Sequence, residues 1–547
     1  MSSPSSPEAD LAKLEREIVD HLFVLQPSYA VMLGLHDYDG RVAEYSTAAT
    51  KRWADRSDDL LDRLEGTPAS SLPTARKTDM FLLRLLLEGP LFDLRATAEL
   101  DHNPMSYLGA VSLTSYISRD YAPIPQRVDA VCRVLEQVPK MLDCGRERLK
   151  APIPKPFLDL ALAIGGGLAA HFAEAEEFAG RGGPELKERV RAVREPAEKA
   201  VTEFLAWLRA YHGPRTTDDF ALGAARYQLL LFVREGIETP FEEIRRAGIA
   251  DLARNQHRLE EIARAENVTV RERLERLFRA HPRADELIPA AREYVDETRR
   301  FVESESLVTI PAEARCRVEE TPVWGRSLST ASMNPPGPFD RTSADGVYYV
   351  TPVDPKWTPQ QQEEWLRTFN RPILRNVTAH EVFPGHYLQF LHFRNSPGSL
   401  TRKVYLSPSF TEGWAHYTEQ LMIERGLGRE SSDAEVAQIH DALLRNVRLL
   451  VSIGLHTRGM TLEEATRMFQ TEAYFERHPA EREAIRGTFN PEYFCYTLGK
   501  LTILNARTRF LTSEFGGDLR AFHDTLLGLG CPPIGLLDSL LLSAKPH

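Results

Sequence analysis

The sequence predicts a mostly α-helical fold with very little β-structure. Apolar residues recur at the 3.6-residue spacing of a helix along most of the 547-residue chain, and stretches in which apolar and polar residues alternate are nearly absent. The composition, 42% hydrophobic and 27% charged, is typical of a folded globular protein rather than a disordered one. We therefore expect a large helical core with at most a small β element.

The expected helices begin close to the N-terminus. Leu11, Leu14 and Ile18 open the first apolar stripe. Similar stripes predict helices over residues 11–25, 48–64, 75–87, 127–149, 157–178, 186–210, 221–234, 241–265, 268–279 and 432–455. Thr461 and Glu464 have the spacing of a capping box, which predicts a further helix start there.

One segment has the composition of a strand. Residues 346–352 read Gly-Val-Tyr-Tyr-Val-Thr-Pro, rich in β-formers and bounded by Gly and Pro. It is either an edge strand or part of an ordinary hairpin that covers a core. No internal repeat or linker is evident, so we expect two helical lobes of one folding unit, over 1–300 and 301–547, with a cleft between them.

Charge and cysteine usage exclude several classes of protein. A net charge of -11 gives no electrostatic footprint for nucleic acid or anionic lipid. The five cysteines are odd in number and form no Cys-x-x-Cys pair, which favours free thiols in a reducing compartment. The first residues lack a basic region followed by an apolar run, and no stretch approaches the roughly 20 apolar residues of a membrane span. We therefore expect a cytoplasmic protein without a membrane partner.

The candidate metal-ligating side chains lie close together in the sequence, between Thr378 and Glu419. His380 and His386 offer two imidazoles, and Glu412 offers a carboxylate on the next helical run. Two imidazoles and a carboxylate form a catalytic zinc site with one open position. We therefore predict one Zn²⁺ bound by these three residues.

The spacing of the two histidines requires a distortion of the helix. Six residues of regular helix turn about 600°, which would leave His380 and His386 roughly 120° apart around the axis. Pro384 clashes with the carbonyl of His380 in a helix, and Gly385 accepts backbone angles that other residues resist. We predict a bulge at Pro384-Gly385 that returns His386 to the face of His380.

Two further carboxylates complete the predicted centre. Glu381 follows the first ligand and is the candidate general base, which takes a proton from a water acidified by the metal. Glu419 lies seven residues after Glu412, on the same helix face, and is a candidate partner that orients a ligating imidazole. The alternatives are a solvated helix charge for Glu381 and a buried salt bridge for Glu412.

These residues resemble a known family. His-Glu-x-x-Pro-Gly-His-x-x-Gln over 380–389 and Glu-Gly-Trp-Ala-x-Tyr-x-Glu over 412–419 are similar to the motifs of bacterial zincin-like proteins catalogued as a domain of unknown function. That family is distantly similar to the gluzincin oligopeptidases and peptidyl-dipeptidases. The resemblance implies a large multi-helix zincin-like fold, with an edge strand beside the metal helix that holds an extended substrate.

Several other residues are weaker candidates. Tyr496 or His456 could stabilise the oxyanion, although a packed Tyr or His is the common alternative. Substrate contacts or support of the ligands are expected from Gln389, His416, Arg458 and Lys500. His416 could also replace a ligand, whereas an exposed arginine and a helix-face histidine are the ordinary interpretations.

The combined prediction is a zinc-dependent hydrolase that cleaves an amide or peptide bond in short peptides or peptide-like small molecules. No Gly-x-Ser-x-Gly elbow or phosphate-binding glycine loop is present, so a serine hydrolase or a nucleotide-binding enzyme has little support. The same two histidines and glutamate could hold non-haem iron in a redox or biosynthetic enzyme. A catalytically silent binding protein is the other alternative, and the oligomeric state is not predicted.

Overall fold

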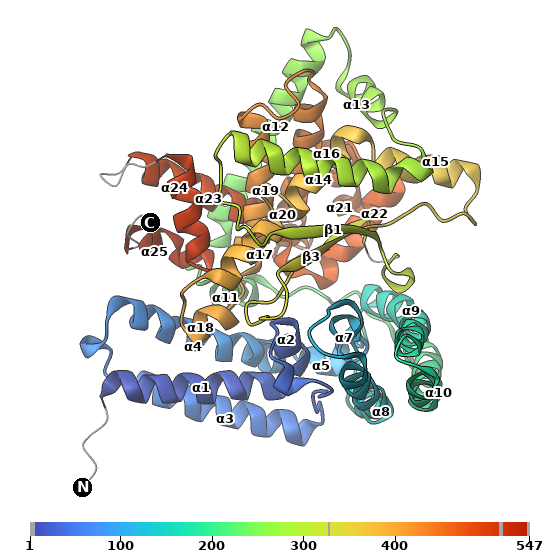
Figure 1. Cartoon of the computed structure of the whole chain (residues 1–547), viewed down its shortest axis with the longest axis vertical. Coiled ribbons are helices and arrows are strands. Elements are labelled where there is room, and N and C mark those ends of the chain that lie inside the picture. The colour runs from blue at the N-terminus through green and yellow to red at the C-terminus, as the bar shows by residue number, and fades with distance from the viewer. Residues whose placement is uncertain (1–5, 327–328, 513–517, 544–547) are drawn as a thin grey trace. The chain divides into compact units, whose positions relative to one another are not determined.

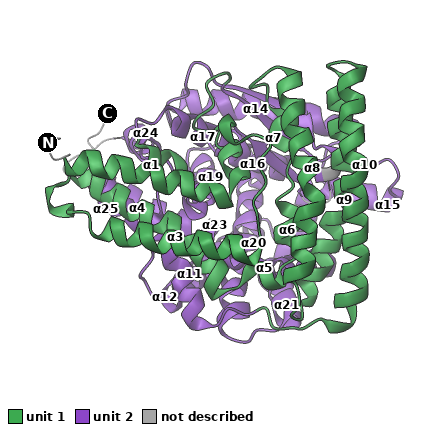
Figure 2. Ribbon diagram, turned by 90° about the horizontal axis from the view of Figure 1, so that it is seen from below, with its two compact units in different colours: residues 1–220, 337–343, 398–405 green, residues 221–336, 344–397, 406–547 purple. Residues whose placement is uncertain are grey.

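A computed structural model describes residues 6–326, 329–512 and 518–543. The chain is mostly helical, as the sequence predicted, and the described residues form one small three-stranded sheet (Figure 1). It divides into two compact units, coloured separately in Figure 2. Unit 1 comprises residues 1–220, 337–343 and 398–405, and unit 2 comprises residues 221–336, 344–397 and 406–547. Residues 221–300 therefore group with the C-terminal part, whereas the sequence suggested a boundary near residue 300.

Unit 1 is built from helices. They are α1 Pro7–Leu25, α2 Pro27–Met32, α3 Thr47–Glu65, α4 Thr74–Leu91, α5 Glu99–His102, α6 Met105–Gly109, α7 Thr114–Ser118, α8 Ile124–Arg148, α9 Lys155–Gly180, α10 Pro184–Trp207 and α18 Leu400–Val404. The six long helices expected from apolar stripes are present. The short helices α5, α6 and α7 were missed because four or five residues are too few for a helical period to repeat.

Helix α9 corrects one expectation. The sequence suggested no stretch long and apolar enough for a membrane span, but α9 meets that requirement by length and composition, alone among the helices of the described residues. The core helix of a folded domain meets it equally well. His171 and Glu176 are buried on α9, and Glu176 pairs with Arg191 of α10 at 2.8 Å. Such pairing is what burial of charged groups inside a protein requires.

Unit 2 contains the remaining helices and the sheet. Its helices are α11 Ala224–Glu235, α12 Phe241–Ala265, α13 Val270–Phe278, α14 Leu287–Ser304, α15 Pro359–Thr368, α16 Arg371–Glu381, α17 His386–Asn395, α19 Pro408–Glu424, α20 Asp433–Thr457, α21 Leu462–Glu472, α22 Arg477–Phe489, α23 Cys495–Thr512, α24 Leu519–Gly528 and α25 Leu537–Ser543. The capping box predicted at Thr461 opens α21, with the Thr461 hydroxyl 3.2 Å from the Glu464 amide. The 25-residue α20 is buried along most of its length and forms the centre of the unit.

The sheet has the strand order β1-β3-β2. Strand β3, Asp345–Val350, is the predicted strand, and it pairs in parallel with β1, Arg315–Glu320, and in antiparallel with β2, Ala331–Asn334. Of the two interpretations that the sequence left open, the edge strand is wrong, because both backbone edges of β3 are already hydrogen-bonded. As in the hairpin interpretation, the preceding strand, β2, is the antiparallel partner of β3. Its continuous run of buried residues, Val347 to Val350, is the pattern of a central strand.

All five cysteines are free thiols, as the odd number and wide spacing predicted. Cys132, Cys495 and Cys531 are buried, and Cys144 and Cys316 are partly exposed. Burial in apolar surroundings raises the pKa of the Cys132 thiol. The three buried thiols therefore behave mainly as small apolar residues of the core.

Candidate metal centre

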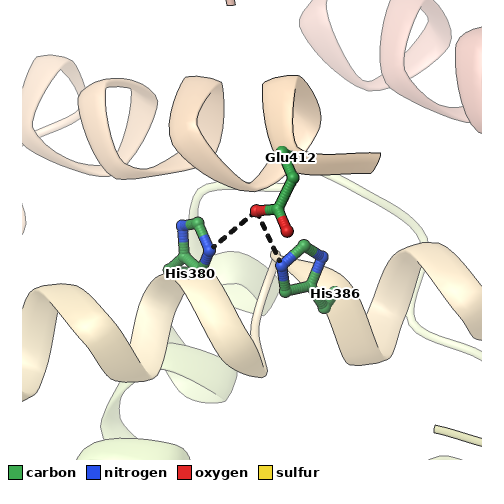
Figure 3. Close-up of side chains that lie close together, drawn as sticks. All are labelled: His380, His386 and Glu412. Carbon is green, nitrogen blue, oxygen red and sulfur yellow. Dashed lines mark ion pairs between the residues drawn. The ribbon is translucent and has the colours of Figure 1, made fainter. Parts of the chain in front are cut away.

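Three helices of unit 2 bring the predicted ligands together. His380 lies in the last turn of α16, His386 is the first residue of α17, and Glu412 lies near the start of α19 (Figure 3). The Nε2 atoms of His380 and His386 lie 3.6 Å and 3.5 Å from the same Oε2 atom of Glu412. Ligand atoms of the three residues all lie within 4.8 Å of one another.

The two histidines are brought to the same side by a break between two helices, rather than by the predicted bulge within one helix. Helix α16 ends at Glu381 and α17 begins at His386, so the histidines belong to two helices (Figure 3). The amide of Gly385 donates to the carbonyl of Ala379 at 3.0 Å. A Cβ atom at Gly385 would lie only 1.7 Å from the backbone oxygen of His380, so this close approach requires glycine.

The two nitrogen–oxygen distances fit a zinc ion. Two ligands at roughly 2.0–2.2 Å from a tetrahedral ion are about 3.4 Å apart, close to the observed 3.5 Å and 3.6 Å. The two imidazole rings stand nearly perpendicular, at 87°. His380 and His386 are 6% and 9% exposed, and the Glu412 side chain is 28% exposed, which leaves one side of the group open. Two nitrogens and one oxygen are a donor set that zinc accepts.

Glu419 forms a hydrogen bond with His380. Its Oε1 lies 2.7 Å from His380 Nδ1, so the carboxylate accepts the Nδ1 proton and leaves the Nε2 lone pair directed toward Glu412. A ligating histidine held by a carboxylate on its other nitrogen is the common arrangement at metal sites. Glu419 is fully buried, and its Oε2 accepts from Asn376 Nδ2 at 3.2 Å.

The electrostatics of the group favour a cation at its centre. Burial lowers the pKa of His380, but hydrogen bonds with Glu412 and Glu419 outweigh burial and raise this pKa to about 9. Burial raises the pKa of Glu412, but the two histidines outweigh burial and hold this pKa well below its usual value. The carboxylates thus stabilise positive charge between them, whether a proton or a metal ion supplies it.

Glu381 lies beside the three candidate ligands, and its carboxylate has no fixed partner among the described residues. Within the described part of the chain, no hydrogen bond or ion pair joins its carboxylate to another residue. Burial raises its pKa, while the positive charge of His386 and His380 lowers it; burial dominates. A carboxylate whose pKa is raised by burial accepts a proton more readily than an exposed one.

Of the two oxyanion candidates, only Tyr496 lies near the group. Its ring is 5.8 Å from the guanidinium carbon of Arg445, which in turn contacts Glu419. His456 lies on α20 eleven residues after Arg445, about 16 Å farther along the helix axis. The His456 Nε2 lies 2.9 Å from the carbonyl oxygen of Gly487, so this histidine joins α20 to α22 away from the ligands.

Four other candidates make structural contacts. Gln389 is buried and donates to the Phe410 carbonyl at 3.4 Å, and His416 is buried with its Nδ1 3.3 Å from Glu419. Lys500 is buried in an ion pair with Asp251 at 2.8 Å, and Arg458 is exposed and pairs with Glu242 at 2.6 Å. Lys500 and Arg458 thus have carboxylate partners within the protein, and the expectation that they contact a substrate finds no support in these contacts.

Three residues of the centre were not identified from the sequence. Arg445 contacts Glu419 at 2.9 Å, and Asp441 and Asn376 are joined at 2.7 Å beside it. Arg445 and Asp441 belong to α20, whose sequence shows only an ordinary apolar stripe with charges. On α16 the sequence identifies Asn370 as a candidate helix cap, but no pattern in the sequence singles out Asn376. Only the packing of α20 against α16 and α19 shows that Arg445, Asp441 and Asn376 lie at or beside Glu419.

Two solved structures share this fold across almost the entire chain. A "putative lipoprotein of unknown function" from Shewanella oneidensis is 24% identical, with a TM-score of 0.79 and coverage of 99% of this chain and 100% of that one. A "putative lipoprotein" from Colwellia psychrerythraea is 19% identical, with a TM-score of 0.82 and coverage of 98% and 99%. No match is found among curated proteins.

The cytoplasmic location expected from the sequence is contradicted by these two structures. Both are described as lipoproteins, a class held at a membrane surface by covalent lipid. The sequence argument relied on cysteine usage and on the composition of the first residues, neither of which reports location directly.

A family model also matches the chain from residue 27 to residue 541, which includes every residue of the candidate centre. The match confirms the resemblance to a domain of unknown function. The chain therefore belongs to the family of bacterial proteins of unknown function called DUF885.

Proposed function

We propose that the protein is a zinc-dependent hydrolase of zincin-like type that cleaves an amide or peptide bond. One observation carries the proposal: His380 Nε2 and His386 Nε2 face a single oxygen of Glu412 at 3.6 Å and 3.5 Å. Nitrogen lone pairs aimed at a carboxylate repel it unless positive charge, from a proton or a metal ion, lies between them, and a metal ion can be shared by all three groups at once. His380, His386 and Glu412 are the residues that hold the zinc ion.

Glu381 acts as the general base. A bound zinc ion supplies Lewis acidity, which polarises the substrate carbonyl and acidifies a water molecule. A carboxylate oxygen of Glu381 takes the proton of the attacking water and then passes it to the leaving amine. The absence of a protein partner for this carboxylate, among the residues described, supports the assignment, because a base must be available to water.

Tyr496 stabilises the oxyanion. Two guanidinium groups flank its ring, with the carbon atoms of Arg445 and Arg448 at 5.8 Å and 5.2 Å from the ring centroid. Burial and the negative charge of Glu412 raise the pKa of Tyr496, so its hydroxyl keeps its proton at all working pH values. A neutral phenol is a hydrogen-bond donor, which is what a developing oxyanion requires.

Short peptides or peptide-like small molecules are the substrates we favour. The two imidazoles are almost fully buried, and the open side of the group is formed by the partly exposed side chains of Glu412 and Glu381. A folded protein chain cannot bring an internal amide bond to such a recessed position, whereas a short flexible segment can.

The test combines metal analysis with a panel of short peptides, on the wild type and on Glu381→Gln. We expect one zinc per chain in both proteins, cleavage by the wild type, and a loss of rate on the order of 10²–10⁴ in the variant. Glu424→Gln, which alters a partly exposed carboxylate at the end of α19, is the matched control and should cleave normally. A wild type that binds no zinc, or a variant that cleaves at the normal rate, would refute the proposal.

The non-haem iron alternative rests on the same donor set, since two histidines and a carboxylate also bind Fe²⁺. Glu381 favours the hydrolase, because oxygen activation needs no general base at that position. Stoichiometric iron and oxygen consumption in the same purified protein would favour the alternative.

A further inference from the structure

Behind His380 lies a buried cluster of polar side chains that the proposed hydrolysis does not use directly. Its members are Asn376, His416, Glu419, Asp441 and Arg445, from helices α16, α19 and α20. Glu419 and His416 are fully buried, and Arg445 is 8% exposed. Buried charge is costly unless it is paired, so the arrangement of this cluster is tightly constrained.

Arg445 contacts Glu419 through both terminal nitrogens. Nη2 lies 2.9 Å from Oε1, and Nη1 lies 3.4 Å from Oε2. Nη1 also donates to the carbonyl oxygen of Asp441 at 3.0 Å, one turn earlier on the same helix. Because a guanidinium group is planar, this two-point contact fixes the plane of the carboxylate as well as its position.

The plane of Glu419 matters because this carboxylate lies between two imidazoles. Oε1 is 2.7 Å from His380 Nδ1, and Oε2 is 3.3 Å from His416 Nδ1. A rotation of the carboxylate would lengthen the shorter contact and leave the orientation of the His380 ring undetermined. The direction of the His380 Nε2 lone pair therefore depends on what holds Glu419.

We propose that Arg445 is a positioning residue for the metal ligand His380, acting through the two-point contact with Glu419. The inference rests on the proposed function, since it requires that His380 binds a metal. Arg445 touches neither substrate nor metal in this scheme. It fixes the carboxylate that sets the tautomer and the direction of the ligating ring.

Helix α20 offers a matched control one turn away. Arg448 is also 8% exposed, forms a two-point contact with Glu483 at 2.7 Å and 2.8 Å, and lies near the same Tyr496 ring. The two arginines differ in what surrounds their carboxylate partners: Glu483 contacts Tyr493, whereas Glu419 contacts the proposed metal ligand His380, whose Nδ1 also lies 3.5 Å from Arg445 Nη2. A purely structural role predicts the same behaviour for both.

The experiment measures the affinity for zinc, and the visible spectrum with cobalt in its place, for the wild type, Arg445→Met, Arg445→Lys and Arg448→Met. We expect zinc affinity to fall on the order of 10-fold in Arg445→Met and less in Arg445→Lys, which keeps the charge but not the planar fork. The cobalt spectrum of both Arg445 variants should change. Arg448→Met should keep wild-type affinity and spectrum, although it loses thermal stability.

The outcomes separate the two proposals. If the wild type binds zinc and Arg445→Met binds it equally well with an unchanged cobalt spectrum, the inference is wrong while the proposed function stands. Equal losses of affinity in Arg445→Met and Arg448→Met would also overturn it, since that result indicates general destabilisation. If Arg445→Met does not fold, Arg445→Lys gives the decision by the same two readouts. A wild type without metal removes the proposed function, and the inference with it.

Discussion

At the scale of single residues, the contacts of the ring nitrogens distinguish His380 from His456. His380 meets the Glu419 carboxylate at 2.7 Å, whereas His456 meets a backbone carbonyl at 2.9 Å. The sequence correctly predicted the grouping of His380, His386 and Glu412, because their spacing carries information about helix faces. The sequence could not show whether His456 and Lys500 belong to the site, because their partners Gly487 and Asp251 come from other parts of the chain.

Removing the hydroxyl of Tyr496 tests the proposed oxyanion donor. We expect Tyr496→Phe to lower kcat on the order of 10²-fold with little change in KM, because the hydrogen bond forms only as charge develops. Steady-state kinetics on a cleaved peptide, with zinc content measured in parallel, give the answer. Tyr493→Phe is the control: it loses a 2.9 Å hydrogen bond to Glu483 and should keep its kcat. An unchanged kcat in Tyr496→Phe would assign this role to another group.

At the scale of elements, helix α19, which carries the proposed ligand Glu412, is fixed by its close approach to α23. Gly413 follows the ligand Glu412, and a Cβ there would lie 2.4 Å from the Cα of Gly499. A Cβ at Gly499 would lie 1.9 Å from the carbonyl oxygen of Ser409. The two glycines therefore let the backbones touch, which explains why glycine stands next to the ligand and next to Lys500.

Adding one methyl group at this crossing should displace α19. We expect Gly499→Ala to lower the free energy of unfolding by about 1–3 kcal/mol or more and to weaken zinc binding, because the ligand helix must move. Thermal unfolding and zinc titration measure the two effects. Gly166→Ala is the matched control, since its Cβ meets nothing within 4 Å on the exposed side of α9. That change should stabilise the helix by up to about 1 kcal/mol; equal effects of the two substitutions would contradict this explanation.

The break between α16 and α17 shows what periodicity can and cannot predict. Pro384 and Gly385 indicated a distortion at the right position, since proline excludes a regular helix there. Whether the chain forms a bulge or two helices depends on the packing around Val382 and Phe383, which are both buried. Likewise β3 was predicted, but its central place requires β1 and β2, which are short and weakly patterned.

At the scale of the whole molecule, buried neutral histidines make the fold of unit 2 sensitive to acid. Burial lowers the pKa of His440, His456 and His523 to about 4 in each case. In the unfolded chain these groups titrate near 6.5, so between pH 6.5 and 4 only the unfolded state binds the protons. The contribution of these histidines to the free energy of unfolding is therefore fully present above pH 6.5. It decreases as the pH drops toward 4, by up to about 3 kcal/mol for each histidine.

His440 gives the cleanest test of this acid sensitivity. Its ring stacks on Phe475 at 5.2 Å between centroids and meets the edge of Phe278 at 5.3 Å, so a phenyl ring can replace it. We expect His440→Phe to lose less stability than the wild type between pH 6.5 and 4.5. Chemical denaturation at several pH values measures how the free energy of unfolding changes with pH. Parallel curves for the two proteins would show that His440 does not contribute.

The division into units was the least predictable feature at this scale. Residues 337–343 and 398–405 lie far along the sequence but belong to unit 1. Thr401, for example, hydrogen-bonds to Glu15 through its amide at 2.9 Å, a contact that spans most of the chain. Local helix patterns carry no information about such pairings, whereas they located the long helices to within a few residues.

The central claim is that one zinc ion is bound by His380, His386 and Glu412. The most direct test is anomalous diffraction at the zinc edge from crystals of the full chain grown with zinc. We predict one peak at about 2.0–2.2 Å from His380 Nε2, His386 Nε2 and a Glu412 carboxylate oxygen. A zinc peak elsewhere in the molecule, or two imidazoles too far apart to reach one ion, would contradict the claim.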